Sequence, residues 1–224
     1  MRLAKIQLAR SIWLFDTAEL NPFGISLFES GVVSNLVQKY RFKQHPNLTD
    51  QPLQAKSWRF DTGSFLHEDG KYYDVGLEVF ADGITGDCRF STVICDAFLR
   101  EVINGIAAEL EVTVAPSIGK KRAYKSELII YADENLSGIS PMLDIISDSL
   151  GELLGVPTEP TAFSFGSDGR HSLFSIERAV NEPFENLKYF SSAMMQTSDH
   201  VTLLNRFTEK TQEMRKSLAE RDEE

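Results

Sequence analysis

Hydrophobic and polar residues follow their most regular pattern between Lys71 and Leu110. Apolar side chains occupy every second position from residue 73 to residue 79, which predicts a half-buried strand. The pair Asp82-Gly83 predicts a tight hairpin turn, because both central residues of such a turn adopt positive φ. The return strand then carries Ile84, Cys88 and Phe90 on its inward side. An antiparallel hairpin is therefore expected before the pattern changes.

From Thr92 onward the spacing becomes that of a helix. Apolar residues recur every four positions and have apolar neighbours on either side, so that only a narrow polar stripe remains at Asp96, Arg100 and Asn104. A helix this broadly apolar is buried on more than one side. We therefore expect residues 92–110 to form the central core helix, with Phe98 fully buried.

The rest of the chain carries shorter versions of the same two patterns. Strands are expected at residues 3–15, 58–66, 123–132, 161–165 and 172–179, and helices at residues 25–40 and 141–154. A mobile loop is expected at residues 45–52, and an ordered coil without a strand at residues 180–196. Because hairpins join consecutive strands, the predicted fold class is α+β: a largely antiparallel mixed sheet of about seven strands with helices packed on one face and a C-terminal amphipathic helix.

The helix expected at residues 141–154 has a clear start, a clear end and one apolar face. Ser140-Pro141 suits a helix start, because serine can cap and proline fits the first helical position. Gly155 and Pro157 end it. The face predicted to be buried consists of Leu143, Ile146, Leu150, Leu153 and Leu154.

The last predicted helix begins at Thr197 and could run to the C-terminus. Leu204, Phe207, Met214 and Leu218, with Thr211 between them, follow alternating steps of three and four, a short heptad seam. We therefore expect a single α+β domain of residues 1–196 and, in residues 197–224, a docking or self-association element. The partner expected at these four residues is a second copy of the chain or another protein subunit.

Composition narrows the classes of partner and compartment. The formal charge of −10 repels nucleic acid and anionic lipid and favours basic partners. No apolar run approaches the roughly 18 residues that span a membrane, and Met1–Lys5 lacks the pattern of a signal peptide. A cytoplasmic protein is expected, with Cys88 and Cys95 reduced.

Cysteines and histidines suggest no catalytic or metal site. Cys88 lies on an inward face and Cys95 inside the central helix, where a free cysteine behaves as a small hydrophobe. Their spacing fits no zinc motif, and no histidine nearby completes a ligand set. The histidines 45, 67, 171 and 200 are scattered beside predicted turns or helix starts and are expected to be solvated. No cofactor or metal is expected.

One cluster of three carboxylates and two clusters of basic residues are the remaining candidate sites. Asp74 and Glu78 share the outward face of one strand, and Asp87 lies outward on the next, an arrangement that could serve metal-dependent hydrolysis or simply keep a sheet face soluble. Lys120-Lys121-Arg122 lacks the glycine and hydroxyl residues of a phosphate loop. Lys39, Arg41 and Lys43 interleave with aromatics, as in surfaces that stack nucleic acid bases, but more often such charges guard a helix end.

Three functions from different classes remain. The first is a protein–protein interaction or assembly subunit that acts through its C-terminal helix. The second is a metal-dependent hydrolase or nuclease that uses Asp74, Glu78 and Asp87. The third is an acidic inhibitor or immunity-type protein that masks a basic partner. The first is favoured, because no motif in the sequence is catalytic.

Overall fold

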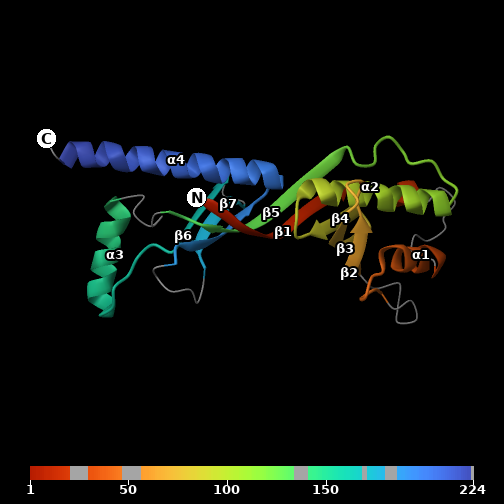
Figure 1. Cartoon of the computed structure of the whole chain (residues 1–224), viewed down its shortest axis with the longest axis horizontal. Coiled ribbons are helices and arrows are strands. Elements are labelled where there is room, and N and C mark those ends of the chain that lie inside the picture. Colours follow the sequence, from red (N-terminus) through yellow and green to blue (C-terminus); the bar gives the residue numbers. More distant parts are fainter. Residues whose placement is uncertain (21–29, 47–56, 134–140, 168–170, 180–185, 223–224) are drawn as a thin grey trace. The chain divides into compact units, whose positions relative to one another are not determined.

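The computed structural model describes residues 1–20, 30–46, 57–133, 141–167, 171–179 and 186–222. Eight strands are hydrogen-bonded in the order β2-β3-β4-β1-β5-β8-β7-β6 (Figure 1). The chain divides into two compact units: unit 1 comprises Met1–Gln7 and Glu127–Glu224, and unit 2 comprises Leu8–Ser126. The predicted α+β class with a largely antiparallel sheet is confirmed, with eight strands in place of about seven. The boundary expected at residue 196 falls inside unit 1 and stays a prediction.

Unit 2 is built on the predicted meander. Its strands are β2 (Ser57–Leu66), β3 (Tyr72–Phe80) and β4 (Gly83–Cys88), with β1 (Arg2–Leu14) and β5 (Lys121–Tyr131) beyond them. The pairings of β2 with β3, β3 with β4, and β4 with β1 are antiparallel. The buried side of this sheet is formed by alternate residues, as the period of two predicts.

The hairpin between β3 and β4 forms, but its central residues differ from those predicted. Phe80 pairs with Gly83, so the turn consists of Ala81 and Asp82. Gly83 is required for another reason. Its φ is +151°, and a Cβ there would lie 2.1 Å from the carbonyl oxygen of Trp13 on β1. The glycine thus permits close strand pairing.

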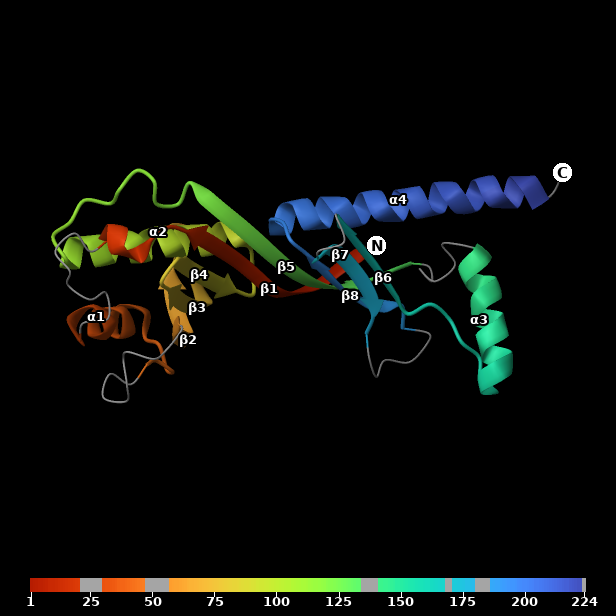
Figure 2. The ribbon, with the colours of Figure 1, turned by 180° about the vertical axis from the view of Figure 1, so that it is seen from behind.

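Helix α2 (Thr92–Glu109) covers one face of the unit 2 sheet (Figures 1 and 2). Ser91 caps its start by accepting a hydrogen bond from the Ile94 amide. Phe98 is fully buried, as predicted. The helix approaches β4 so closely that a Cβ on Gly86 would lie 2.8 Å from Leu99. Broad burial of α2 therefore depends on a glycine in the strand beneath it.

Shorter elements complete unit 2. Helix α1 (Ser30–Tyr40) forms the end of the helix predicted at residues 25–40, and the predicted residues before Ser30 lie outside the described part of the chain. A 3-10 helix, η1 (Thr17–Leu20), follows β1. Most of the loop predicted at residues 45–52 also lies outside the described residues.

In unit 1, helix α4 (Thr197–Asp222) packs against the strands β7 (His171–Arg178) and β8 (Lys188–Ala193). Strand β6 (Ala162–Ser167) pairs with β7 at the edge of the sheet. Its core is formed by residues from β5, β7, β8 and α4: Leu128, Ile130, Phe174, Ile176, Tyr189, Ala193 and Leu204. Strand β8 corrects the expectation of a coil at residues 180–196. The residues of β8 alternate in burial, and the strand pairs with β7. The strand at β7 was expected, but the sequence did not show that this segment pairs with it.

Helix α3 (Pro141–Leu154) ends where predicted, because Gly155 adopts φ +68° just after it. The predicted burial of its apolar face is wrong. Leu143 is half-buried, and the exposed fractions of Ile146, Leu150, Leu153 and Leu154 run from 46% to 82%. The pattern is that of a packed helix, but among the described residues no element covers these four side chains.

Candidate functional site

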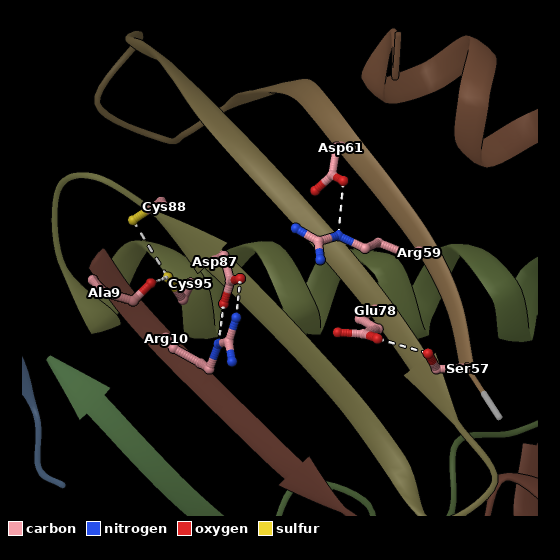
Figure 3. Close-up of polar contacts among 9 residues, drawn as sticks. All are labelled: Ala9, Arg10, Ser57, Arg59, Asp61, Glu78, Asp87, Cys88 and Cys95. Carbon is pink, nitrogen blue, oxygen red and sulfur yellow. Dashed lines mark hydrogen bonds and ion pairs between the residues drawn. The ribbon is translucent and has the colours of Figure 1, made fainter. Parts of the chain in front are cut away.

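The three carboxylates singled out from the sequence lie on the sheet face opposite α2. Asp87 is held by Arg10 of β1 through two parallel contacts, each 2.6 Å, from Nε and Nη2 of the guanidinium to the two carboxylate oxygens (Figure 3). The register explains the pairing, because Arg10 lies directly opposite Asp87 in the β1–β4 ladder. Both oxygens of Asp87 are thus engaged by a cation.

Neighbouring carboxylates on this face are also held. Glu78 accepts a 2.6 Å hydrogen bond from the Ser57 hydroxyl, and Asp61 accepts a 2.7 Å hydrogen bond from Nε of Arg59 (Figure 3). The Asp61 hydrogen bond and charge raise the pKa of Arg59, and Glu78 and Asp87 contribute less. Asp74, two residues before Gly76 in β3, is exposed.

On this face of the sheet, arginine side chains pair with the carboxylates, an arrangement more typical of a solvated surface than of a metal-dependent catalytic centre. A metal ion needs carboxylate oxygens without a competing cation, whereas Arg10 and Arg59 lie among these acids. Among the described residues, no group of three or more His, Cys, Asp or Glu side chains could hold a metal ion. Asp61 and Asp87 flank Gly76, where a Cβ would lie 3.6 Å from Asp61 and 3.7 Å from Asp87, whereas Glu78 is held by Ser57. This arrangement offers ion pairing and solubility.

Other residues singled out from the sequence take structural positions. The Lys39 amino group forms an ion pair with Glu101, 2.9 Å away. Arg122 lies over the Trp13 ring and 3.2 Å from Asp96. His200 is fully buried, not solvated, with Nε2 2.9 Å from the Ser191 hydroxyl. The side chain of His171 lies outside the described part.

Sequence reasoning missed the polar group around Asp96 in unit 2. Its carboxylate accepts hydrogen bonds from Ser11 (2.5 Å), the Trp13 indole (2.9 Å) and Tyr124 (3.0 Å), besides the contact with Arg122. These donors come from β1 and β5, so Asp96 connects α2 to two strands. Its place in the polar stripe of α2 was visible in the sequence, but the donors come from distant segments. The arrangement is structural.

Helix α3 exposes an apolar face, which we call the α3 stripe and define as Ile146, Leu150, Leu153 and Leu154. Three of these residues follow steps of four and three, the spacing of a helix seam. The segment after the helix contacts positions at the margin of the stripe and leaves the four stripe residues exposed. Thr158 donates to the carbonyl oxygen of Ser147 at 2.5 Å, and a Cβ on Gly151 would lie 3.1 Å from the Val156 oxygen.

The charge around the α3 stripe has one sign. Every charged residue between Ser126 and Gly169 is acidic, and helix α3 itself carries Asp144, Asp148 and Glu152. Asp133 forms an ion pair with the amino group of Met1 at 2.7 Å, and Glu159 forms one with Arg178 at 2.6 Å. Asp148 and Glu152 are exposed. An apolar stripe on an acidic helix therefore faces solvent.

The four residues of the predicted α4 seam have different environments. Leu204 is buried in the core of unit 1, and Phe207 packs against that core beside Phe174. Met214 is half-exposed. Leu218 lies in the helix, but its side chain is outside the described part. The proximal seam therefore serves the core, and Met214 faces solvent.

The chain matches no known protein family, no curated protein and no solved structure. Among the described residues, no helix is both long enough and apolar enough to cross a membrane.

Proposed function

We propose that this protein works by binding another protein, with the α3 stripe as the main contact and Met214 of α4 as a second one. The observation that carries the proposal is the exposure of Ile146, Leu150, Leu153 and Leu154 on one helix. Contiguous exposed apolar residues of this kind mark interaction surfaces. The association function expected from the C-terminal helix is thereby extended to a second helix of the same unit.

The energetics of a short helix support a missing partner. Isolated helices below about 12–15 residues are marginal in water, and most helical stability in proteins comes from packing an apolar face. Helix α3 has 14 residues and leaves that face in solvent. Burying one leucine side chain contributes about 1.5–3 kcal/mol. A partner that covers the stripe would stabilise the helix, and the same burial of apolar side chains would contribute to the binding free energy.

The charge supports a basic partner over a second copy. All three charged residues of α3 are acids, and two copies of a chain with charge −10 repel each other. Asp148 and Glu152 are close neighbours of Leu150 and Leu153 on the same helix, and charges closer than about 8 Å still interact at physiological salt. We therefore commit to a partner that presents an apolar seam flanked by lysine or arginine.

A pair of synthetic helical peptides tests the proposal. One peptide carries leucine at heptad positions a and d with lysine at e and g, and its twin carries glutamate in place of lysine. Fluorescence anisotropy should show that the lysine peptide binds the full chain, that added salt weakens this binding, and that the glutamate peptide fails to bind. Equal binding of both peptides would contradict the proposed chemistry.

Variants of exposed residues assign the binding to the stripe. The double variant Leu150→Ser, Leu153→Ser should lose at least about tenfold in affinity for the lysine peptide, since each tenfold is about 1.4 kcal/mol. Ile145→Ser is the matched control: Ile145 is also exposed on α3 but lies outside the stripe, so its affinity should stay unchanged. If sedimentation shows a dimer that this double variant dissociates, the occupant is a second copy and the proposed basic partner is wrong.

A further inference from the structure

Two thiols meet in unit 2, and nothing in the proposed function uses them. Cys88 is the last residue of β4, and Cys95 lies in the first turn of α2. They are the only cysteines in the chain. Their sulfur atoms are 3.3 Å apart (Figure 3). Both side chains are buried, with 4% and 0% of their surface exposed.

The separation is close to that of a disulfide. A sulfur–sulfur bond is about 2.05 Å long, so the two atoms need to approach by only about 1.3 Å. Residues 89–91, outside any helix or strand, connect the two elements, and the Phe90 side chain is half-exposed. This short connection can absorb the movement without breaking β4 or the body of α2.

Hydrogen bonds make the two sulfurs unequal. The Cys95 thiol lies 3.3 Å from Cys88 Sγ and 3.2 Å from the Ala9 carbonyl oxygen, so its proton has two acceptors. Cys88 Sγ accepts from the Phe90 amide at 3.4 Å, and its own thiol lies 3.3 Å from the Ser91 carbonyl oxygen. The hydrogen bond from Cys95 lowers the pKa of Cys88, against the effect of burial, and the same bond together with burial raises the pKa of Cys95. Cys88 is therefore the more nucleophilic sulfur and Cys95 the proton donor.

We propose that Cys88 and Cys95 form an oxidisable pair, which hydrogen peroxide converts into an intramolecular disulfide. The Cys88 thiolate attacks one peroxide oxygen, the O–O bond breaks, and hydroxide leaves as water after taking a proton. Cys95 then attacks the Cys88 sulfur of the sulfenic acid. The S–O bond breaks, and hydroxide leaves as water with the Cys95 proton. In total, two thiols and one peroxide become one disulfide and two waters.

Burial makes the pair selective. Bulky thiol reagents and protein disulfides need an exposed sulfur, whereas a peroxide molecule is small and uncharged. Because the Cys95 sulfur is already in contact with Cys88, it can react with the sulfenic acid before a second peroxide molecule oxidises Cys88 further. The pair is thus shielded from large reagents, and its oxidation product is a disulfide that a reductant can reverse.

Intact-mass spectrometry of the full, reduced chain tests the proposal. After peroxide treatment, quenching, denaturation and alkylation, the product should be lighter by two hydrogens and should carry no alkyl group, whereas the untreated chain carries two. A reductant should restore both alkylation sites. Persistence of two alkylatable thiols at peroxide levels that oxidise the denatured chain would overturn the proposal. So would an interchain disulfide or addition of two or three oxygens without a disulfide.

Single variants assign the order of events. In Cys95→Ser, Cys88 should stop at the sulfenic acid, which gains one oxygen and reacts with dimedone. In Cys88→Ser, oxidation of Cys95 should be at least about tenfold slower, because its thiolate is disfavoured. Equal rates in the two variants would contradict the assigned order. The wild-type mass measurement does not depend on either variant folding.

Discussion

Helices α2 and α3 carry the same kind of sequence pattern but end in opposite surroundings. Both have a wide apolar face; Ser91 caps the start of α2, and Gly155 follows the end of α3. The apolar residues of α2 lie against the unit 2 sheet, with Phe98 and Leu99 fully buried, whereas Leu153 of α3 is 82% exposed. An apolar face predicts that a helix has a partner, but it does not say whether that partner belongs to the same chain.

Connectivity accounts for the difference. Only three residues separate β4 from α2, so the helix folds back over the hairpin that precedes it, and Gly86 leaves room for the approach. Contacts this close in sequence cost little loop entropy. After α3, the chain turns back over Ser147 and Gly151 and leaves the neighbouring stripe residues exposed.

The largest expected effect is in α2. Phe98→Ala should lower the free energy of unfolding by about 3–5 kcal/mol, because it removes a fully buried ring and leaves a cavity. Urea unfolding at fixed pH measures the change. Val93→Ala, an exposed position on the same helix, should stay within about 0.5 kcal/mol of the parent. If the two variants lose equal stability, α2 is not the core helix.

A second comparison lies within α4. Leu204→Ala should cost about 2–5 kcal/mol, because Leu204 is part of the unit 1 core. Met214→Ala should cost less than about 0.5 kcal/mol, since Met214 is half in solvent. Thermal unfolding followed by circular dichroism compares them. A large loss for Met214→Ala would mean that the distal helix is packed in the isolated chain.

The polar group around Asp96 should have an intermediate effect. Asp96→Ala removes the acceptor of the Ser11 hydroxyl, which is fully buried, whereas the Trp13 indole keeps a 3.2 Å contact with the Ser11 oxygen. Unpaired buried polar groups cost about 1–3 kcal/mol. Asp82→Ala is the control at an exposed carboxylate. Chemical denaturation of both should show a loss for Asp96→Ala alone, and an unaffected Asp96→Ala would show that the group is not structural.

The smallest effect on stability is expected in α3. Leu153→Ala should change the free energy of unfolding by no more than about 0.5 kcal/mol, because the side chain is already in solvent. The same variant should nonetheless weaken binding of the lysine peptide, measured by anisotropy. A loss of several kcal/mol in the free chain would show that another part of the chain covers the stripe, and the contrast with α2 would disappear.

Local pattern by itself determined much of this protein. The period of two identified β2 and β3, and the period near four identified α2 together with the burial of Phe98. Gly155 marked the end of α3. These features depend on neighbouring residues in the chain, whose geometry is set by backbone sterics and side-chain alternation.

Tertiary structure decided everything that joins distant residues. Strand β8 exists because β7 pairs with it, and Gly83 is needed because β1 passes beside it. The ion pair of Arg10 with Asp87 joins residues 77 positions apart, and register alone brings them together. The contact of Cys88 with Cys95 and the open face of α3 likewise depend on how elements dock. A side chain's type limits which contacts it can make, but only the packed chain determines which partner it meets or whether it meets one.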